Sequence, residues 1–453
     1  MRIAYFSPFP PKRTGIAIYS SCLVHELRKL IEVDCYDFGV ESTEDSASIH
    51  DFARTGRICD LAQYDSVVYQ IGNNPHYHSD IYQTLRQFPG IVVLHDTVLY
   101  YLFAGFGTDG LIKHLWQNYG SEAVREIEQI VSASPEHDVL RYRTPERYPL
   151  AASMLAHATH VVVHNGGARE YLRSLGSSRP IHLLPHPASP SADPPAKPGA
   201  LRELRERYRF AKEELVIGCF GLIGPTKRIP QVCRALATLK EKLRFRFLIV
   251  GEGDDLSAIL HETGLADRTI RTGFADEGAF SLHLRLTDIV INLRHPSMGE
   301  SSGTLTRAMV LGKPCIVSND AAFAELPDHT VQKVPIGDKE IAELAQAINR
   351  LSLDKAARKG LGAAAKQYAA VHLDPPAVAR QFVDIIETEI KDKAQGALLA
   401  NAYEFYGTDF AGRALRESLH RRVPPHLQRL FDSTAHALSP HLRQSIGSLD
   451  GQS

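Results

Sequence analysis

The stretch NLRHPSMGESSGTLTRAMVLG, residues 292–312, says most about the fold of this chain. An apolar run that predicts a strand, DIVINL (288–293), ends just before a loop that holds one carboxylate, Glu300. Three small residues follow, and an apolar periodicity then predicts a helix from about Thr304 to Gly312. The first N–H groups of a helix have no partner within it, and its dipole is positive at that end. Such a terminus suits a phosphate, and a carboxylate beside it can hold hydroxyls, which together describe a sugar nucleotide.

Strand and helix patterns alternate on both sides of this stretch. Alternation of this kind predicts parallel sheets covered by helices on both faces. We therefore expect an α/β protein with two Rossmann-like, doubly wound domains facing a central cleft, and a helical C-terminal extension. A long helical stretch is expected at about 98–157. The predicted strands are 2–7, 33–38, 65–72, 90–96 and 159–165 in the first half, and 215–221, 245–253, 269–274, 288–293 and 314–319 in the second.

Composition marks where the two domains meet. Residues 187–200, PASPSADPPAKPGA, are rich in Pro, Ala and Ser, which is typical of a linker or exposed loop. We place an N-terminal Rossmann-like domain at 1–190 and a C-terminal one at 201–370. Two prolines open a predicted helix at 371–395, which we expect to return to the N-terminal domain. Residues 396–453 form a helical tail to which no role is assigned, and the oligomeric state is left open.

Charge and cysteine usage exclude several classes of protein. The formal net charge of -1 over 453 residues lacks the excess of positive charge that is typical of nucleic-acid-binding proteins. The six cysteines are scattered without metal-ligand spacing, which fits reduced thiols and a cytoplasmic protein. The start lacks the apolar core of a signal peptide, and no apolar run is long enough to span a bilayer. Peripheral contact with the inner face of a membrane through Trp116 is an open alternative, although a helix packed on its own domain is favoured.

Loops that follow strands are the first candidates for a ligand site, because ligands of open α/β sheets bind at the carboxyl ends of the strands. Gly15 lies where the first loop enters a helix, and His95 ends a buried strand. Lys227 and Arg228 lie in the loop LIGPTKRI (222–229), where two cations face the unfavourable end of a helix dipole and therefore suit a ligand anion. A strain-relieving glycine, a satisfied histidine and a solvated basic pair are the plain structural alternatives.

The loop QIGNNPHYH (70–78) adds groups that suit carbohydrate hydroxyls, because amides and imidazoles both donate and accept hydrogen bonds. We take Asn73, Asn74 and His76 as acceptor-side candidates, although such residues also occur in ordinary turns. No carboxylate or cysteine completes a metal-ligand set with His76, so no metal is expected. The G-x-G of IVGEGDDL (249–256) lacks its third glycine and is a weak dinucleotide signal.

Taken together, the loops 222–229 and 294–307 resemble those of GT-B glycosyltransferases of the retaining family 4, also called glycosyl transferases group 1. That family shows a glycine in its first loop, a strand-end histidine, a G-R-x-x-x-x-K loop, and an E-x7-E motif that continues into E-A-M-A-x-G-x-P-V. GTLTRAMVLGKPCIV (303–317) is similar to the last part. The resemblance covers about 1–390 in architecture and is most specific over 215–330.

The resemblance implies a role for each matching residue. Glu300, His95 and Lys227 would be the catalytic residues: Glu300 and His95 beside the transferred sugar, and Lys227 on the diphosphate. Gly15 would lie near the same diphosphate. Backbone N–H groups that bind the sugar and the phosphates would come from Ser301, Ser302, Gly303 and Thr304.

Two positions depart from the family pattern. Leu222 replaces the loop arginine, so Arg228 or Arg294 would substitute for it. Arg307 stands where the second glutamate, a ribose ligand, is usual, and the spacing from Glu300 is one residue shorter. Because a guanidinium cannot accept a proton from a ribose hydroxyl, either the nucleoside is held differently or Arg307 binds a phosphate.

The function expected from this resemblance is that of a retaining glycosyltransferase. It would move a sugar from a nucleotide diphosphate sugar to a glycan or lipid-linked acceptor in polysaccharide or glycoconjugate biosynthesis, with no metal or other cofactor. Two alternatives keep the fold: a non-catalytic sugar-nucleotide-binding scaffold subunit, and a sugar-nucleotide epimerase. A phosphorylase is disfavoured, because no lysine lies in a convincing pyridoxal-phosphate context.

Overall fold

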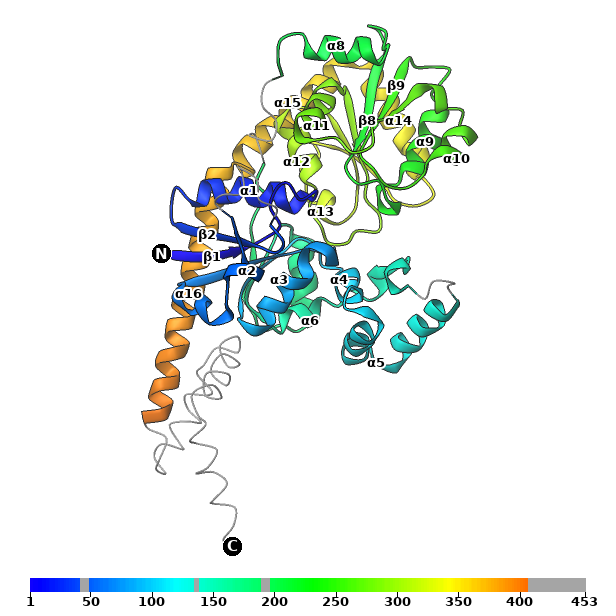
Figure 1. Ribbon diagram of the computed structural model, residues 1–453. Helices are drawn as coiled ribbons and strands as arrows, with labels where there is room; N and C mark the ends of the chain where they lie inside the picture. Colours follow the sequence, from blue (N-terminus) through cyan, green and yellow to red (C-terminus); the bar gives the residue numbers. More distant parts are fainter. Residues whose placement is uncertain (41–48, 134–137, 189–195, 406–453) are drawn as a thin grey trace.

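Two α/β domains stand one above the other in this computed structural model, and the last helix runs from one back along the other (Figure 1). The structure describes residues 1–40, 49–133, 138–188 and 196–405. Most of the predicted linker at 187–200, and residues 406–453 of the predicted tail at 396–453, lie outside the described residues.

The N-terminal domain is built on a seven-stranded parallel sheet. Its strands are β1 (Arg2–Phe6), β2 (Glu32–Asp37), β3 (Ile49–Asp51), β4 (Ser66–Ile71), β5 (Gly90–Leu94), β6 (Ala158–Val163) and β7 (Ile181–Leu183). They follow the order β3-β2-β1-β4-β5-β6-β7. Successive side chains of a strand point to opposite faces, so Ile3 and Tyr5 enter one core while Ala4 and Phe6 enter the other. Both faces are therefore covered, and the strands read as continuous apolar runs.

Helices cover both faces of this sheet. They are α1 (Gly15–Leu27), α2 (Phe52–Thr55), α3 (Pro75–Gln87), α4 (Tyr100–Ala104), α5 (Gly107–Ala133), α6 (Ala151–Leu155) and α7 (Gly166–Ser174), with short 3₁₀ helices η2 (Ile58–Gln63), η3 (Val139–Arg141) and η4 (Pro145–Arg147). The helical stretch predicted at about 98–157 consists of several helices, α4, α5, η3, η4 and α6. Gly120 interrupts α5 with a left-handed φ of 76°, and Leu150 precedes α6 with a φ of 59°.

The C-terminal domain repeats the architecture with six parallel strands. They are β8 (Leu215–Phe220), β9 (Phe245–Val250), β10 (Thr269–Arg271), β11 (Ile289–Asn292), β12 (Cys315–Ser318) and β13 (Gln332–Val334). Their order is β10-β9-β8-β11-β12-β13. The helices are α8 (Ala200–Arg207), α9 (Ile229–Ala237), α10 (Ser257–Glu262), α11 (Glu277–Leu286), α12 (Gly303–Val310), α13 (Ala321–Ala324), α14 (Glu340–Leu353) and α15 (Lys355–His372), with 3₁₀ helices η6 (Pro225–Lys227) and η7 (Ala266–Arg268).

The last helix, α16 (Pro375–Phe405), leaves the C-terminal domain and packs on α1 of the N-terminal domain (Figure 1). Its buried Val378, Phe382 and Ile386 share one core with side chains of α1 and the sheet. Burying each such side chain contributes about 1.5–3 kcal/mol. The chain passes between the two domains twice, and the two passages meet where the N–H of Ala188 donates to the carbonyl of Leu373 at 2.8 Å.

The predicted two-domain α/β architecture is confirmed. Three strands, β3, β7 and β13, escaped prediction because each is three residues long and presents no apolar run. Within the described ranges, no helix combines the length and the apolarity that a membrane crossing requires.

Candidate active site

A cleft of about 660 Å³ opens between the two domains at the carboxyl ends of their strands. The loop after β1 and the start of α1 line it from the N-terminal side. The loops after β8, β9, β10 and β11 line it from the C-terminal side. This is where a doubly wound sheet places its ligands.

The start of α12 points its first turn into this cleft. Ser302 caps the helix: its Oγ accepts a hydrogen bond from the N–H of Leu305 at 3.2 Å and donates to Asn292 Oδ1 at 3.3 Å. Ser301, Gly303 and Thr304 line the cleft beside it. The helix begins at Gly303, close to the predicted start. A capped helix N-terminus therefore faces the cavity, which is a geometry that suits an anion.

Lys227 extends from η6 into the same corner and is only 6% exposed. Its Nζ donates a hydrogen bond to the carbonyl of Phe220. A Cβ placed on Gly221 would lie 3.2 Å from this Nζ and 3.5 Å from Thr304 Oγ1, so the glycine keeps lysine and helix terminus close. Burial and the nearby Arg294 hold the pKa of Lys227 well below its usual range. An entering anion would reverse that shift and favour the charged lysine.

Arg294 and Glu300 form an ion pair at the edge of this corner. Arg294 Nε lies 3.1 Å from Glu300 Oε1, and the N–H of Met298 donates to Glu300 Oε2 at 2.7 Å. Arg294 lines the cleft, whereas Glu300 lies next to it without forming part of the lining. Glu300 therefore fixes the loop before α12 and orients the Arg294 guanidinium.

Hydrogen bonds from the N-terminal domain hold this loop. The N–H groups of Thr97 and Val98 donate to the carbonyl of Met298 at 2.8 and 3.1 Å. Asn165 Nδ2 donates to the carbonyl of Gly299 at 3.0 Å. Gly299 has a φ of 84°, and a Cβ there would come within 2.0 Å of Thr97 Oγ1, so only glycine permits this approach. The catalytic candidates of the C-terminal domain are thereby tied to the opposite domain.

Arg228 does not reach the cleft, which corrects its assignment as a donor-binding residue. It has a left-handed φ of 57°, and its Nε donates to Glu340 Oε1 at 3.1 Å. Glu340 is 1% exposed, so the pair neutralises a buried carboxylate at the start of α14. Of the two arginines expected to replace the family arginine, the structure brings only Arg294 to the cleft.

Arg307 is buried in the wall of the cleft. Its guanidinium lies 2.8 Å from Glu277 Oε2 and 4.3 Å above the ring of Phe280. All three residues line the cleft. The position that departs from the family pattern is thus paired with a carboxylate of α11.

His95 belongs to a cluster of rings on the N-terminal side. Its Nε2 lies 2.7 Å from Gln70 Oε1, and its ring meets that of Tyr19 edge-on at 4.6 Å. The rings of His164 and His186 complete the cluster, each 5.1 Å from Tyr19. Burial lowers the pKa of His95 far below its usual range, that of His164 to about 3 and that of His186 to about 4. The cluster is therefore neutral at pH 7.

Tyr19 and His186 form the part of this cluster that lines the cleft, whereas His95 does not. The Tyr19 hydroxyl is buried and has no hydrogen-bond partner among the described residues. An unpaired buried hydroxyl costs about 1–3 kcal/mol, which a ligand hydroxyl could recover. The resemblance identified His95 in this cluster, and neither Tyr19 nor His186 carries a local sequence signal.

The three acceptor-side candidates have different surroundings. Asn73 Oδ1 accepts hydrogen bonds from the N–H groups of Tyr101 and Leu102, so its side chain holds the start of α4. Asn74 caps α3 and lines the cleft. His76 is exposed and lies outside the cleft lining. Only Asn74 is brought to the site.

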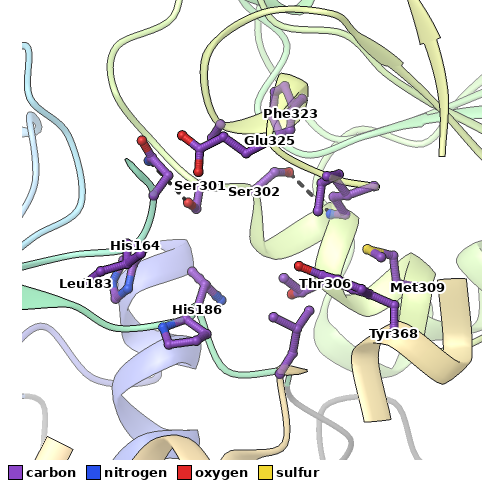
Figure 2. Close-up of a pocket in the computed structure, with 16 residues that line it drawn as sticks. His164, Leu183, His186, Ser301, Ser302, Thr306, Met309, Phe323, Glu325 and Tyr368 are labelled. Carbon is purple, nitrogen blue, oxygen red and sulfur yellow. Dashed lines mark hydrogen bonds between the residues drawn. The ribbon is translucent and has the colours of Figure 1, made fainter. Parts of the chain in front are cut away.

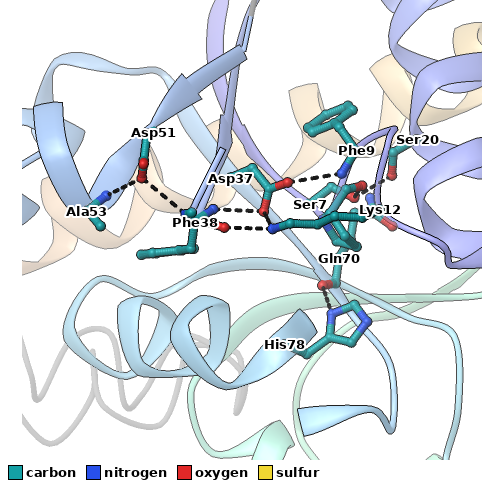
Figure 3. A network of polar contacts seen from close by, with 12 residues as sticks. Ser7, Phe9, Lys12, Ser20, Asp37, Phe38, Asp51, Ala53, Gln70 and His78 are labelled. Atoms are coloured by element: carbon teal, nitrogen blue, oxygen red, sulfur yellow. Dashed lines mark hydrogen bonds and ion pairs between the residues drawn. The ribbon is translucent and has the colours of Figure 1, made fainter. Parts of the chain in front are cut away.

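The first loop also places cations at the cleft. Gly15 lines it, with open space where a Cβ would stand. Lys12 Nζ donates to Asp37 Oδ1 and to the carbonyl of Phe38, each at 2.6 Å, which fixes the loop on the end of β2 (Figure 3). Arg13 stacks 4.0 Å above the ring of Phe274 on the opposite domain. The sequence did not single out this contact, because its two residues lie far apart along the chain.

A smaller cavity of about 210 Å³ adjoins the cleft, with Ser301, Ser302, Thr306 and His186 shared between them (Figure 2). Across it, the N–H groups of Gly166 and Gly167 donate to the Glu325 carboxylate at 2.8 and 2.6 Å. A carboxylate of the C-terminal domain thus caps α7 of the N-terminal domain. Among the residues that the structure describes, no cluster of three or more His, Cys, Asp or Glu could hold a metal ion.

Comparison with known proteins relates part of this chain to a sequence family. Residues 202–368 match the sequence family described as glycosyl transferases group 1. Similar relatives include the 2-deoxystreptamine glucosyltransferase of Streptomyces kanamyceticus, 27% identical over 40% of this chain and 47% of the relative. The GDP-mannose-dependent alpha-(1-6)-phosphatidylinositol monomannoside mannosyltransferase of Mycobacterium tuberculosis is 25% identical over 42% of this chain and 51% of the relative. The chain matches about half the length of these relatives.

Solved structures resemble nearly the whole described fold. Sucrose-phosphate synthase (tll1590) from Thermosynechococcus elongatus superposes with a TM-score of 0.60 at 17% identity, over 86% of this chain and 99% of that one. Anabaena Alr3699/HepE in complex with UDP-glucose gives a TM-score of 0.60 at 16% identity, over 86% and 100%. At this identity the likeness shows the fold alone. The chain therefore has the fold of the GT-B glycosyltransferases, and its residues 202–368 match the family described as glycosyl transferases group 1.

Proposed function

We propose that this protein is a retaining glycosyltransferase that moves a sugar from a nucleotide diphosphate sugar to a hydroxyl of a glycan or lipid-linked acceptor. One observation carries the proposal. Buried Lys227, Arg294 and the capped start of α12 converge on one corner of the cleft between the domains. Two cations and a helix N-terminus suit a diphosphate leaving group.

The chemistry depends on stabilising the departing diphosphate. As the bond from the anomeric carbon to the phosphate oxygen breaks, negative charge grows on that oxygen, next to Lys227 and Arg294. On the retaining route the acceptor oxygen bonds to the anomeric carbon from the same face. Its proton passes to the leaving phosphate oxygen. Glu300 would act by orienting Arg294 and by stabilising positive charge on the sugar, and no metal is needed for these steps.

The neutral rings of the N-terminal face suit the other half of the reaction. Tyr19 and His186 offer hydrogen bonds without charge, which fits sugar or acceptor hydroxyls. The structure of Alr3699/HepE contains UDP-glucose, and the mycobacterial relative is GDP-mannose-dependent. A screen for this chain therefore includes both nucleotides.

The test follows both products of transfer. Purified protein is incubated with UDP- and GDP-sugars and a panel of glycan and lipid-linked acceptors, with and without EDTA. We expect free nucleoside diphosphate and a new α-configured glycosidic bond from an α-linked donor, unchanged by EDTA. Tight donor binding without either product would favour the scaffold alternative, and an isomerised donor would favour an epimerase. Lys227→Ala should reduce transfer by orders of magnitude.

Peripheral membrane contact stays a prediction. Trp116 of α5 is 60% exposed and Tyr119 is 38% exposed, while Leu111 and Leu115 of the same helix are buried in the domain. Flotation with anionic liposomes, comparing the native chain with Trp116→Ser, tests it: equal flotation of both proteins would remove this residue from any lipid contact.

A further inference from the structure

Glu277 offers a carboxylate to the cleft from an element that the family motif does not include. It is the first residue of α11, its side chain is 49% exposed, and it lines the cleft. A carboxylate in a site for a diphosphate would normally repel its ligand. The pairing with Arg307 removes this objection, because the pair is neutral as a whole.

The pair is held in one orientation. Arg307 is 7% exposed, and its guanidinium is fixed between the Phe280 ring at 4.3 Å and Glu277 Oε2 at 2.8 Å. A guanidinium stacked on an aromatic ring keeps its plane, so it aims its donors along a defined direction. One carboxylate oxygen of Glu277 faces Arg307. The half-exposed carboxylate retains further acceptor positions.

The position along α12 indicates which part of a nucleotide meets this carboxylate. Arg307 lies four residues beyond Gly303, which corresponds to about 6 Å along the helix axis. If the start of α12 binds the phosphates, the next group of a nucleotide along that wall is its ribose. A ribose presents two neighbouring hydroxyls, and a carboxylate is the acceptor that suits both.

We propose that Glu277 accepts the hydrogen bonds of the ribose hydroxyls of the donor nucleotide, and that Arg307 is the positioning residue that holds it there. The inference rests on the proposed function, since it assumes that the phosphates lie at α12. It explains how a chain with an arginine at the position of the ribose-binding glutamate can still grip a nucleoside. The carboxylate comes from α11 instead of α12.

The experiment compares ribose with a ribose that lacks both hydroxyls. Affinities of UDP, GDP and ADP, each beside its 2′,3′-dideoxy form, are measured by calorimetric titration. For the best nucleotide, the native chain should prefer the ribose form about tenfold or more. Glu277→Gln should bind the ribose form about as weakly as the dideoxy form, and Arg307→Met should lose most of the same preference. Glu252→Gln, which removes another exposed carboxylate of the cleft, is the matched control and should keep it.

The outcomes separate this inference from the proposed function. A ribose preference that survives in Glu277→Gln would overturn the inference while leaving the donor site intact. If Glu277→Gln lost affinity only for GDP and kept the ribose preference, the inference would be overturned, because Glu277 would then recognise the base. Absence of binding of any nucleoside diphosphate to the native chain would overturn the donor site itself. Circular dichroism of Glu277→Gln checks that the exposed substitution leaves the fold unchanged.

Discussion

The C-terminal face of the cleft and the ring cluster opposite it differ in charge. The C-terminal face carries Lys227, Arg294, Arg307 and Glu277. Besides the first-loop cations Lys12 and Arg13, the N-terminal domain offers Tyr19 and His186, and burial keeps this ring cluster, the neutral face, uncharged. Each face thus suits one half of the proposed transfer reaction: charged groups suit a departing diphosphate, and neutral hydrogen-bonding groups suit hydroxyls. The division also follows the family match, which covers residues 202–368 and leaves the N-terminal face outside it.

The largest effect is expected at the Arg294–Glu300 pair. Glu300→Gln removes the charge that orients Arg294 while keeping a similar shape. Transfer should fall about 10²–10³-fold, the loss typical of one misplaced electrostatic contact in a transition state. Steady-state transfer rates measure it, and nucleoside diphosphate affinity should change far less. A variant with normal turnover would remove Glu300 from the reaction.

Substitution of Arg228 should lower the stability of the protein, whereas substitution of its neighbour Lys227 should weaken nucleotide binding. Arg228→Met leaves Glu340, which is 1% exposed, as an unpaired buried carboxylate, and should lower the free energy of unfolding by about 3–5 kcal/mol. Urea unfolding measures this loss, and the double variant Arg228→Met/Glu340→Leu should recover most of it. If Arg228→Met instead weakened nucleotide binding in a fully stable protein, its assignment outside the site would be wrong.

Gly299 tests how firmly the charged face is tied to the neutral one. A Cβ at this position would meet Thr97 Oγ1 at 2.0 Å, so Gly299→Ala should cost about 1–3 kcal/mol of unfolding free energy. Gly15→Ala is the matched control, because nothing lies within 4 Å of a Cβ there. Thermal unfolding compares the two. Equal melting temperatures would mean that the loop before α12 shifts away from Thr97 at no cost in stability, which would contradict a firm tie between the domains.

The neutral face should make the protein sensitive to acid. The folded pKa of His186 is lowered to about 4, whereas an unfolded histidine titrates near 6.5, so protons bind the unfolded chain preferentially between these values. Stability is therefore present above about pH 6.5 and is lost as the pH falls toward 4, and this residue should account for a loss of about 2 kcal/mol by pH 5. Unfolding of the native chain and of His186→Gln at pH 7 and pH 5 measures the difference. An identical loss in both would contradict a buried neutral His186.

The sequence predicted the architecture because long apolar runs alternate with helical patterns, as at β4 and β9. It also located the start of α12, since the small residues before an apolar periodicity mark a helix terminus. It could not decide which of Lys227 and Arg228 enters the cleft. That choice depends on a left-handed φ at Arg228 and on Glu340, 112 residues further along the chain.

Glu277 is a clearer example of a residue whose place in the site could not be predicted from the sequence. It carries no motif, and its importance depends on where α11 places it against Arg307 and Phe280. His95 shows the opposite case. Its strand-end position was visible in the sequence. Its contact with Tyr19 of α1, which lines the cleft where His95 does not, depends on how α1 packs against the sheet. Contacts between elements decide these roles, and local patterns do not contain them.

The division of the cleft into a charged and a neutral face is tested most directly by the affinity of one nucleoside diphosphate for three proteins. The best binder among UDP, GDP and ADP is titrated into the native chain, Lys227→Met and His186→Gln at pH 7.5. We predict a loss of at least about tenfold for Lys227→Met, because the diphosphate loses a buried cation, and less than about twofold for His186→Gln. Equal losses in both variants, or a larger loss in His186→Gln, would contradict the account.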